Sequence, residues 1–193
     1  DGRETAPAAA TRDMYLRNGE FDPLLSQEGV LAVGVPGIVA AYEEALELAG
    51  TKTLAEAVQP SIPVARDGFV LDEPYAHVIR ETAEKLKTDP TSRAIYLHED
   101  GSPLAAGEML LQPDLAATYE KIAARGTDYF YKGEFAEQLA AFMEANGGLI
   151  TEADMAGYKV HYREPIVGDY RDYKIIGMAP PSSGGVHVLQ ILN

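Results

Sequence analysis

The sequence predicts an α+β fold that is mostly helical and has a C-terminal strand pair. Two patterns support this prediction. Apolar residues recur at helical spacing between capping residues over most of positions 1–157, and two runs rich in β-branched and aromatic residues follow within 158–179. The composition agrees, because 46% of the 193 residues are hydrophobic and 24% are charged, as in globular proteins.

The N-terminal segment carries signals for a helix and then for a loop. Thr5, with Pro7 two positions on, predicts a helix that runs to about Arg17. Polar, turn-rich residues at 18–29 predict a loop, and the short apolar run at 30–35 predicts an extended segment.

The next two segments have stronger helix signals. Residues 36–50 begin with proline, show one apolar stripe and end at a glycine, which is the pattern of an amphipathic helix. Thr53 and Glu56 form a capping box at the start of the segment that follows. Because Pro60 and Pro63 interrupt this segment, we expect a kink or two short helices.

The middle of the chain predicts mainly helices. Capping residues, early prolines and terminal glycines mark helices at 72–87, 114–125 and 134–146. A short strand is predicted at 94–97, where the residues are apolar or aromatic. Thr151, at the end of the middle region, predicts the start of a further short helix.

The last part of the chain has a different character. Residues 158–167 and 173–178 are rich in β-branched and aromatic residues and flank a Gly-Asp turn, which predicts a hairpin. Two strands do not form an independent sheet, so we expect the other strands to lie outside this chain. The run Pro-Pro-Ser-Ser-Gly-Gly at 180–185 predicts a rigid turn into a last helix.

These elements, together with the chain ends, predict a piece of a larger domain. The sequence starts at Asp1 in a polar loop and stops at Asn193 within an apolar run. We therefore interpret 1–193 as a single segment and not as a complete domain. Its parts are a mainly helical region (1–157), a strand pair (158–179), and a turn with the start of a helix (180–193).

Composition excludes several functions. Thirty acidic residues against sixteen Lys and Arg give a formal net charge of −14, and such a surface repels nucleic acid and anionic lipid. The chain has no cysteine, which excludes disulfides, thiolate metal sites and a cysteine nucleophile. No apolar run approaches the roughly 18 residues that a membrane helix needs.

Few residues form a recognisable catalytic or metal-binding pattern. None of the four histidines has the spacing of a metal pair, so we interpret them as surface or core residues: His77, His98, His161 and His187. Gly184-Gly185 after Ser182-Ser183 fits a phosphate-binding nest or an oxyanion hole. No nucleotide-binding glycine motif and no G-x-S-x-G elbow is present, so we favour a structural turn.

Arg3 is the one candidate binding residue. It precedes a predicted helix N-terminus, where a guanidinium fork can grip a carboxylate with both nitrogens, helped by the helix dipole. From the residues alone, the ordinary alternative is a surface ion pair with Asp1 or Glu4, and that alternative is favoured.

Motifs along nearly the whole chain resemble one family. Each is weak alone, but their order and spacing are specific: Arg3-Glu4-Thr5-Ala6-Pro7, Ala10-Thr11-Arg12-Asp13-Met14, Val33-Gly34-Val35-Pro36-Gly37, Val58-Gln59-Pro60, Ala65-Arg66-Asp67-Gly68-Phe69, Phe130-Tyr131-Lys132-Gly133, Asn146-Gly147-Gly148-Leu149-Ile150-Thr151, Gly168-Asp169-Tyr170-Arg171 and Pro180-Pro181-Ser182-Ser183-Gly184-Gly185. The chain resembles an internal part of the large subunit of γ-glutamyltranspeptidase (glutathione hydrolase).

The resemblance implies a fold and an activity. Members of the family are proenzymes with the αββα sandwich of N-terminal nucleophile hydrolases, and they cleave themselves into a large and a small subunit. The new N-terminal threonine of the small subunit attacks the γ-glutamyl amide of glutathione or a related compound. The γ-glutamyl group then passes to water or to an amino-acid or peptide acceptor. No cofactor or metal is implied, and a periplasmic or extracellular location is expected from the family.

The resemblance also changes the interpretation of Arg3. In the family, the arginine of the R-E-x-A-P stretch grips the α-carboxylate of the γ-glutamyl group, so this role is expected of Arg3. The T-x-H-x-[ST] pattern of the processing site is absent from the chain. We therefore expect no catalytic residue here, no activity of the chain alone, and a small subunit of the same proenzyme as its partner.

Two alternatives stay open at this point. A related N-terminal nucleophile hydrolase, such as a cephalosporin acylase or a polyglutamate transpeptidase, would keep the fold and change the substrate. A helical binding module without catalytic function would keep only the sequence resemblance. Arg3 favours the hypothesis of a γ-glutamyl substrate, because an arginine that binds an α-carboxylate suits that group.

Overall fold

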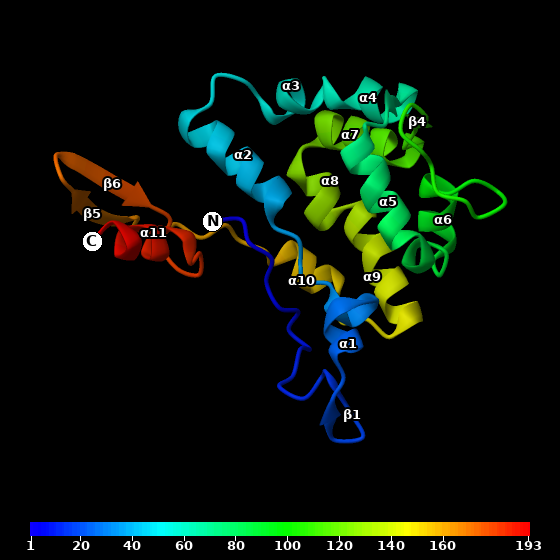
Figure 1. The fold of residues 1–193 in the computed structure, drawn as a ribbon, viewed down its shortest axis with the longest axis horizontal. Helices are drawn as coiled ribbons and strands as arrows, with labels where there is room; N and C mark the ends of the chain where they lie inside the picture. The colour runs from blue at the N-terminus through cyan, green and yellow to red at the C-terminus, as the bar shows by residue number, and fades with distance from the viewer.

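The chain forms a helical body and a smaller C-terminal unit, joined by an extended segment (Figure 1). The computed structural model describes residues 1–193. We call residues 1–157 the helical body, 158–165 the connecting segment and 166–193 the C-terminal unit. The body contains the helices α1 (Pro23–Gln27), α2 (Ile38–Ala49), α3 (Leu54–Val58), α4 (Ser61–Asp67), α5 (Glu73–Leu86), α6 (Pro90–Tyr96), α7 (Pro113–Arg125), α8 (Thr127–Lys132), α9 (Glu134–Asn146) and α10 (Glu152–Ala156).

The strands are short and form three antiparallel pairs. Two pairs lie in the body, β1 (Leu16–Arg17) with β2 (Glu20–Phe21) and β3 (Phe69–Val70) with β4 (Met109–Leu110). The third pair, β5 (Ile166–Tyr170) with β6 (Tyr173–Gly177), forms the C-terminal unit together with α11 (Gly184–Leu192). A 3₁₀ helix, η1, spans Val30–Ala32. This confirms a mostly helical α+β fold with a C-terminal strand pair.

Several predicted elements are confirmed because their end signals are local. Thr53 caps α3, and its hydroxyl and the Glu56 carboxylate satisfy each other's backbone N–H groups as a capping box does. Pro60 separates α3 from α4, so the interrupted segment is indeed two short helices. Asp72 caps α5 through the backbone N–H of Tyr75.

The predicted helix over residues 5–17 is wrong. Thr5 instead forms an antiparallel bridge with Val35, and the backbone N–H of Ala8 donates to the carboxylate of Asp154. Both partners lie far along the chain, and their hydrogen bonds hold this segment in an extended and turning path. Tertiary contacts therefore override the local signal of Thr5 and Pro7.

Other boundaries differ as well. The predicted strand at 94–97 is the end of α6, because Asp89 caps that helix and Pro90 occupies its first position. The predicted first strand at 158–167 is shorter in the structure: only Ile166 and Val167 of this stretch pair with β6, whereas His161 exchanges its backbone hydrogen bonds with Asp1. The structure also has elements that were not predicted: β1 at the end of the expected helix, β2 and α1 within the expected loop, η1 within the expected extended run, the pair of β3 and β4, and α8.

The interior of the body consists of two hydrophobic clusters. The larger one contains Val35, Leu54, Ile122, Tyr129, Phe130, Tyr131, Ala136, Met143, Ile150 and Met155. The smaller one contains Leu71, Ile79, Ala83, Leu97 and Leu110. Helices α8, α9 and α10 pack on one another around the larger cluster. None of the helices combines the length and the apolar character needed to cross a lipid bilayer.

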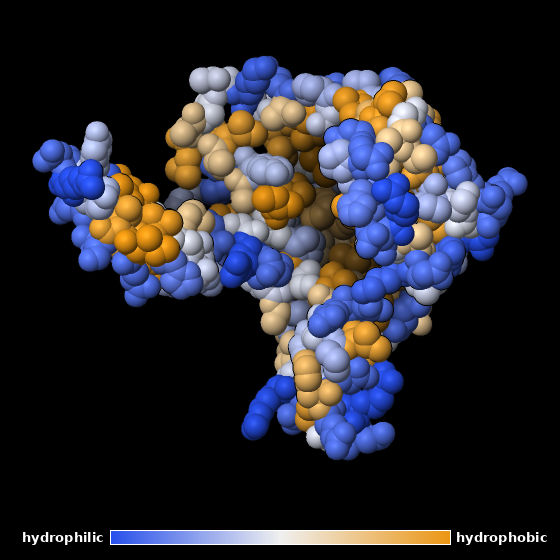
Figure 2. Space-filling view, viewed as in Figure 1, coloured by the Kyte–Doolittle hydropathy of each residue, from blue (hydrophilic) through white to orange (hydrophobic).

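The C-terminal unit has no buried residue. Figure 2 shows apolar residues gathered on its surface, at the left of the view. Helix α11 approaches the hairpin through a glycine, since a Cβ added to Gly185 would lie 2.5 Å from the carbonyl oxygen of Met178. This close backbone contact explains why the first turn of α11 needs glycine at position 185.

Candidate functional site

The candidate site is built around Arg3, on the extended segment at the start of the chain. Two backbone hydrogen bonds join this segment to the stretch before α2: Thr5 donates to Val35 over 3.2 Å, and Val35 donates to Thr5 over 2.8 Å. Gly34 allows this pairing, because a Cβ there would lie 3.0 Å from Cγ of Glu4. Two of the motifs that carried the family resemblance therefore lie side by side.

Hydrogen bonds fix the backbone of Arg3 on both sides. Its N–H donates to Oδ1 of Asp1 over 3.0 Å, and its carbonyl oxygen accepts from the hydroxyl of Tyr158 over 2.9 Å. Asp1 is itself held, because it exchanges two backbone hydrogen bonds with His161, of 2.7 and 3.0 Å. The peptide that carries the arginine thus has a defined position.

The guanidinium group of Arg3 is exposed and has no acidic partner in the chain. The second carboxylate oxygen of Asp1 pairs with Nε of Arg163 over 2.7 Å, and Glu4 forms no ion pair. The ordinary alternative for Arg3, a surface pair with Asp1 or Glu4, is therefore wrong. The site offers an unpaired fork of donors to an outside anion.

One feature of the expected site is not present. Because residues 5–17 are not helical, no helix begins directly after Arg3. The prediction that a helix dipole at this position assists carboxylate binding is therefore wrong. The helix end that lies near this segment is the start of α2. Gly2 contacts it, since a Cβ on Gly2 would lie 3.0 Å from the carbonyl oxygen of Gly37.

Asp154 anchors the following stretch of the segment. Its Oδ1 accepts from the backbone N–H of Ala8 over 2.7 Å, and its Oδ2 accepts from the N–H and the hydroxyl of Thr151 over 2.9 and 2.7 Å. Partial burial acts to raise the pKa of Asp154, but these hydrogen bonds outweigh it and hold the pKa below its ordinary value of 3.8. One carboxylate thus starts α10 and secures the loop after Arg3.

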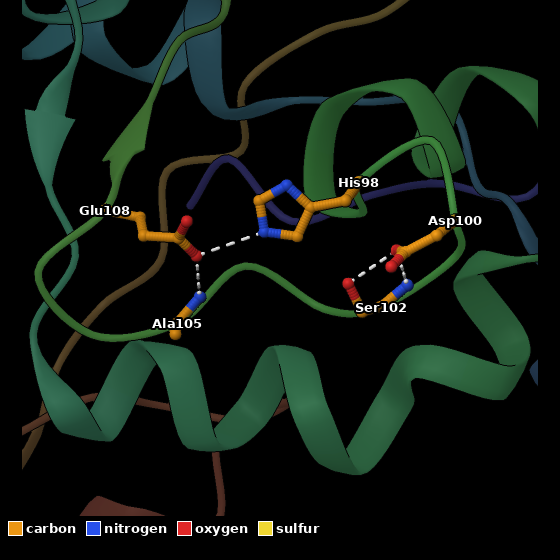
Figure 3. Close-up of polar contacts among 5 residues, drawn as sticks. All are labelled: His98, Asp100, Ser102, Ala105 and Glu108. Atoms are coloured by element: carbon orange, nitrogen blue, oxygen red, sulfur yellow. Dashed lines mark hydrogen bonds and ion pairs between the residues drawn. The ribbon is translucent and has the colours of Figure 1, made fainter.

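A second polar cluster lies in the loop between α6 and β4 (Figure 3). Nε2 of His98 lies 3.2 Å from Oε2 of Glu108, which also accepts from the N–H of Ala105 over 2.6 Å. Asp100 accepts from the N–H and hydroxyl of Ser102 over 2.9 and 2.6 Å, so this serine points at an acid and not at the histidine. The cluster shapes the loop and has no nucleophile paired with a base.

The structure also describes the possible metal ligands and the turn at Ser182-Ser183-Gly184-Gly185. No group of three or more His, Asp or Glu side chains is arranged to hold a metal ion. The backbone of Gly185 packs against β6, and α11 begins at Gly184 without a side-chain cap. This packing supports the interpretation of Ser-Ser-Gly-Gly as a structural turn and not as a binding site.

Three residues of the site were missed by sequence reasoning: Tyr158, Asp154 and Tyr131. Tyr158 and Arg3 are 155 positions apart in the chain, and no local pattern links them. The one available signal was that the motifs containing Arg3, Gly37 and Tyr131 recurred together in the family resemblance. The structure shows that these motifs are neighbours in space.

The structural comparison defines the class of protein. The fold matches a crystal structure of γ-glutamyltranspeptidase from Helicobacter pylori with a TM-score of 0.95 and 41% sequence identity, over 100% of this chain and 55% of that chain. The chain therefore has the fold of part of an N-terminal nucleophile hydrolase.

The family comparison is more specific. The model of the γ-glutamyltranspeptidase family matches residues 1–193, and the chain belongs to this family. The glutathione hydrolase proenzyme of Escherichia coli (strain K12) is 48% identical over 100% of this chain and 33% of its own length. An acylase proenzyme, ACY 1 of Pseudomonas sp. (strain SE83), is 42% identical over 100% and 36%. The chain spans about a third of the length of the curated relatives it matches.

Proposed function

We propose that this chain is part of the large subunit of a γ-glutamyltransferase. The complete enzyme cleaves the γ-glutamyl amide of glutathione and related compounds and transfers the group to water or to an amino-acid or peptide acceptor. The small subunit of the same proenzyme supplies the nucleophilic threonine and is the partner of this chain. The location that we propose is periplasmic or extracellular, in keeping with the family.

The observation that carries the proposal is the state of Arg3. Its backbone is held at both the N–H and the carbonyl oxygen, while its guanidinium is exposed and unpaired. The peptide that carries the guanidinium is already positioned, so binding a carboxylate costs little additional ordering of the backbone. The family membership and the names of the glutathione hydrolase relatives support γ-glutamyl compounds as the substrate.

The role of this chain is binding and orientation. A planar guanidinium matches a carboxylate with two parallel N–H···O bonds, which fixes both the position and the rotation of the bound group. Since the chain has a formal net charge of −14, an anionic substrate needs a local cation to offset this field. Arg3 supplies that cation, and holding the α-carboxylate aims the γ-amide at the nucleophile of the other subunit.

The test uses the complete enzyme and γ-glutamyl-p-nitroanilide as substrate. Arg3→Ala is expected to lower kcat/KM, with a loss of about 2–4 kcal/mol of transition-state stabilisation. A loss of this size is typical when one partner of a desolvated charge pair is removed. Arg3→Lys is expected to recover only part of this loss, because an ammonium cannot form the bidentate pair. Unchanged kinetics in Arg3→Ala would contradict the proposal.

A matched control separates local from general effects of charge. Arg12→Ala removes the same type of side chain from an exposed site. The Arg12 side chain is 96% exposed, and its Nε lies 3.9 Å from Oδ1 of Asp13, which makes a long ion pair. This variant is expected to keep the kinetics of the unmodified enzyme. An equal loss in both variants would show that net charge, and not the position of Arg3, determines substrate binding.

An acylase is the second candidate function, favoured by the 42% identity to an acylase proenzyme. The two candidates differ in the acyl group of the scissile amide, since both acyl groups end in a carboxylate but only the γ-glutamyl group has an α-amino group beside it. Assaying the complete enzyme on γ-glutamyl-p-nitroanilide and on a glutaryl cephalosporin distinguishes them. Preference for the cephalosporin would favour the acylase.

A further inference from the structure

Tyr158 connects Arg3 to the interior of the helical body. Its hydroxyl donates to the carbonyl oxygen of Arg3 over 2.9 Å, and its backbone N–H donates to the carbonyl oxygen of Met155 over 3.1 Å. Met155 is fully buried, at 0% exposure. The tyrosine therefore reaches from the end of α10, at the edge of the core, to the peptide that carries the arginine.

The ring of Tyr158 is held by a second tyrosine. It stacks on Tyr131 with ring centroids 5.6 Å apart and an interplanar angle of 13°. The hydroxyl of Tyr131 donates to the carbonyl oxygen of Pro36 over 2.9 Å and accepts from the N–H of Ala40 over 3.2 Å. Since Tyr131 is 6% exposed, this support belongs to the core and to the first turn of α2.

A glycine makes the arrangement possible. A Cβ added to Gly37 would collide with the hydroxyl and ring of Tyr158. Gly37 precedes α2 with a φ of −118°, which other residues also adopt, so space and not backbone conformation requires glycine here. Tyr158 therefore packs between Gly37 and Tyr131, and its hydroxyl holds the backbone of Arg3.

The hydroxyl of Tyr158 is suited to remain a donor. Burial, followed by the nearby charge of Glu4, raises the pKa of Tyr158 above its ordinary value of 10.0. The group therefore stays protonated at neutral and mildly alkaline pH, and the Arg3 carbonyl keeps its partner.

We propose that Tyr158, supported by Tyr131, is a positioning residue that sets the affinity of Arg3 for the substrate carboxylate. This inference rests on the proposed function, because it assigns to Arg3 the carboxylate of a γ-glutamyl group. Tyr158 itself touches no substrate. It limits the motion of the Arg3 peptide, so that the guanidinium meets the carboxylate in one orientation.

The test is a double-mutant cycle in the complete enzyme with γ-glutamyl-p-nitroanilide. Tyr158→Phe keeps the stacked ring and removes only the hydroxyl. We expect KM to rise about three- to tenfold, the size of one neutral hydrogen bond, with kcat within about twofold. In the Arg3→Ala background, Tyr158→Phe should change kcat/KM no further, because the group it positions is gone.

Tyr15→Phe is the matched control. The hydroxyl of Tyr15 also donates to a backbone carbonyl, that of Leu31 over 3.3 Å, and this bond does not involve Arg3 or its neighbours in the chain. This variant should keep the KM and kcat of the unmodified enzyme. The melting temperatures of all variants are measured alongside, and Tyr158→Phe should match Tyr15→Phe in stability.

Three outcomes would overturn the inference. If Tyr158→Phe lowers kcat/KM by the same factor with and without Arg3, the tyrosine acts independently of the arginine. If Arg3→Ala raises KM and Tyr158→Phe does not, the proposed function stands and the positioning role fails. If Arg3→Ala itself leaves KM unchanged, the proposed function fails and this inference fails with it.

Discussion

The helical body and the C-terminal unit differ in how their apolar residues are placed. Every buried residue of the chain lies at or before Met155, and none lies in 166–193. The C-terminal unit is nevertheless apolar, with Tyr173, Ile176 and Ile191 exposed by 71%, 67% and 82%. The body therefore has its own core, whereas the unit has apolar surface without one.

This difference shows where the site obtains its rigidity. Arg3 is connected to the body through Tyr158 and Val35, and Tyr158 is the first residue of the connecting segment. The contacts further along the segment, from His161 and Arg163 to Asp1, are polar and lie at the surface. On the side of the body, the hydrogen bond to Arg3 is backed by the stacked ring of Tyr131 in the core. On the side of the C-terminal unit, the contacts to Asp1 are polar and have no buried support.

The same substitution, isoleucine to alanine, should have very different costs in the helical body and in the C-terminal unit. Ile150→Ala removes a side chain that is 2% exposed in the larger cluster and should cost about 2–5 kcal/mol of unfolding free energy. Ile176→Ala removes the same atoms from a side chain that is 67% exposed and should cost less than about 0.5 kcal/mol. Urea denaturation measures both free energies of unfolding, and equal costs would contradict the difference in packing between the two regions.

The next effect concerns a close backbone contact inside the C-terminal unit, between α11 and the end of the hairpin. Gly185→Ala places a methyl group 2.5 Å from the carbonyl oxygen of Met178 and should separate α11 from the hairpin, at a cost of about 1–3 kcal/mol. Gly184→Ala is the adjacent control, since its nearest neighbour is the Ser182 hydroxyl at 3.8 Å. That variant should be neutral or slightly stabilising, because alanine favours a helix. Hydrogen exchange of α11 amides distinguishes the two.

A somewhat smaller effect is expected at the boundary of the body. Asp154→Ala removes one half of the capping box of α10, in which Thr151 is the N-cap, together with the acceptor for Ala8, and should cost about 1–2 kcal/mol. The loop after Arg3 should then exchange its amide protons faster. Glu152→Ala, on the same helix but exposed, is the control for helix charge, and a loss as large as that of Asp154→Ala would contradict the anchoring role.

The smallest effect is the pH dependence of the same carboxylate. Because its pKa in the folded protein lies below the ordinary 3.8, Asp154 contributes stability that is fully present above this pH. That contribution is lost as the pH falls from about 3.8 through the folded value. Acid denaturation of Asp154→Asn should therefore show a shallower dependence on pH in this range. An unchanged slope would show that the hydrogen bonds to Asp154 contribute little.

Sequence reasoning succeeded where the signal was local. The capping box of Thr53 and the caps of α5 and α9 lie within a few residues of the helices that they begin or end, so their boundaries were predictable. It failed where distant residues compete. Thr5 and Pro7 form a good helix start, yet Val35 and Asp154 hold their segment extended.

The site was predictable only in part. Arg3 stood out through the resemblance to a family, and a surface pair was the favoured interpretation from the residues alone. Its freedom depends on Arg163, which occupies the carboxylate of Asp1 from 162 positions away. The stacking of Tyr131 on Tyr158 likewise has no sequence pattern. These contacts arise from packing, which a single sequence does not reveal.

A crystal structure of the complete enzyme with glutamate bound would show directly which cation holds the α-carboxylate. We expect two guanidinium nitrogens of Arg3 to lie about 2.7–3.2 Å from the two α-carboxylate oxygens, with the Tyr158 hydroxyl still bonded to the Arg3 carbonyl. A structure in which another cation holds that carboxylate while Arg3 points into solvent would contradict it.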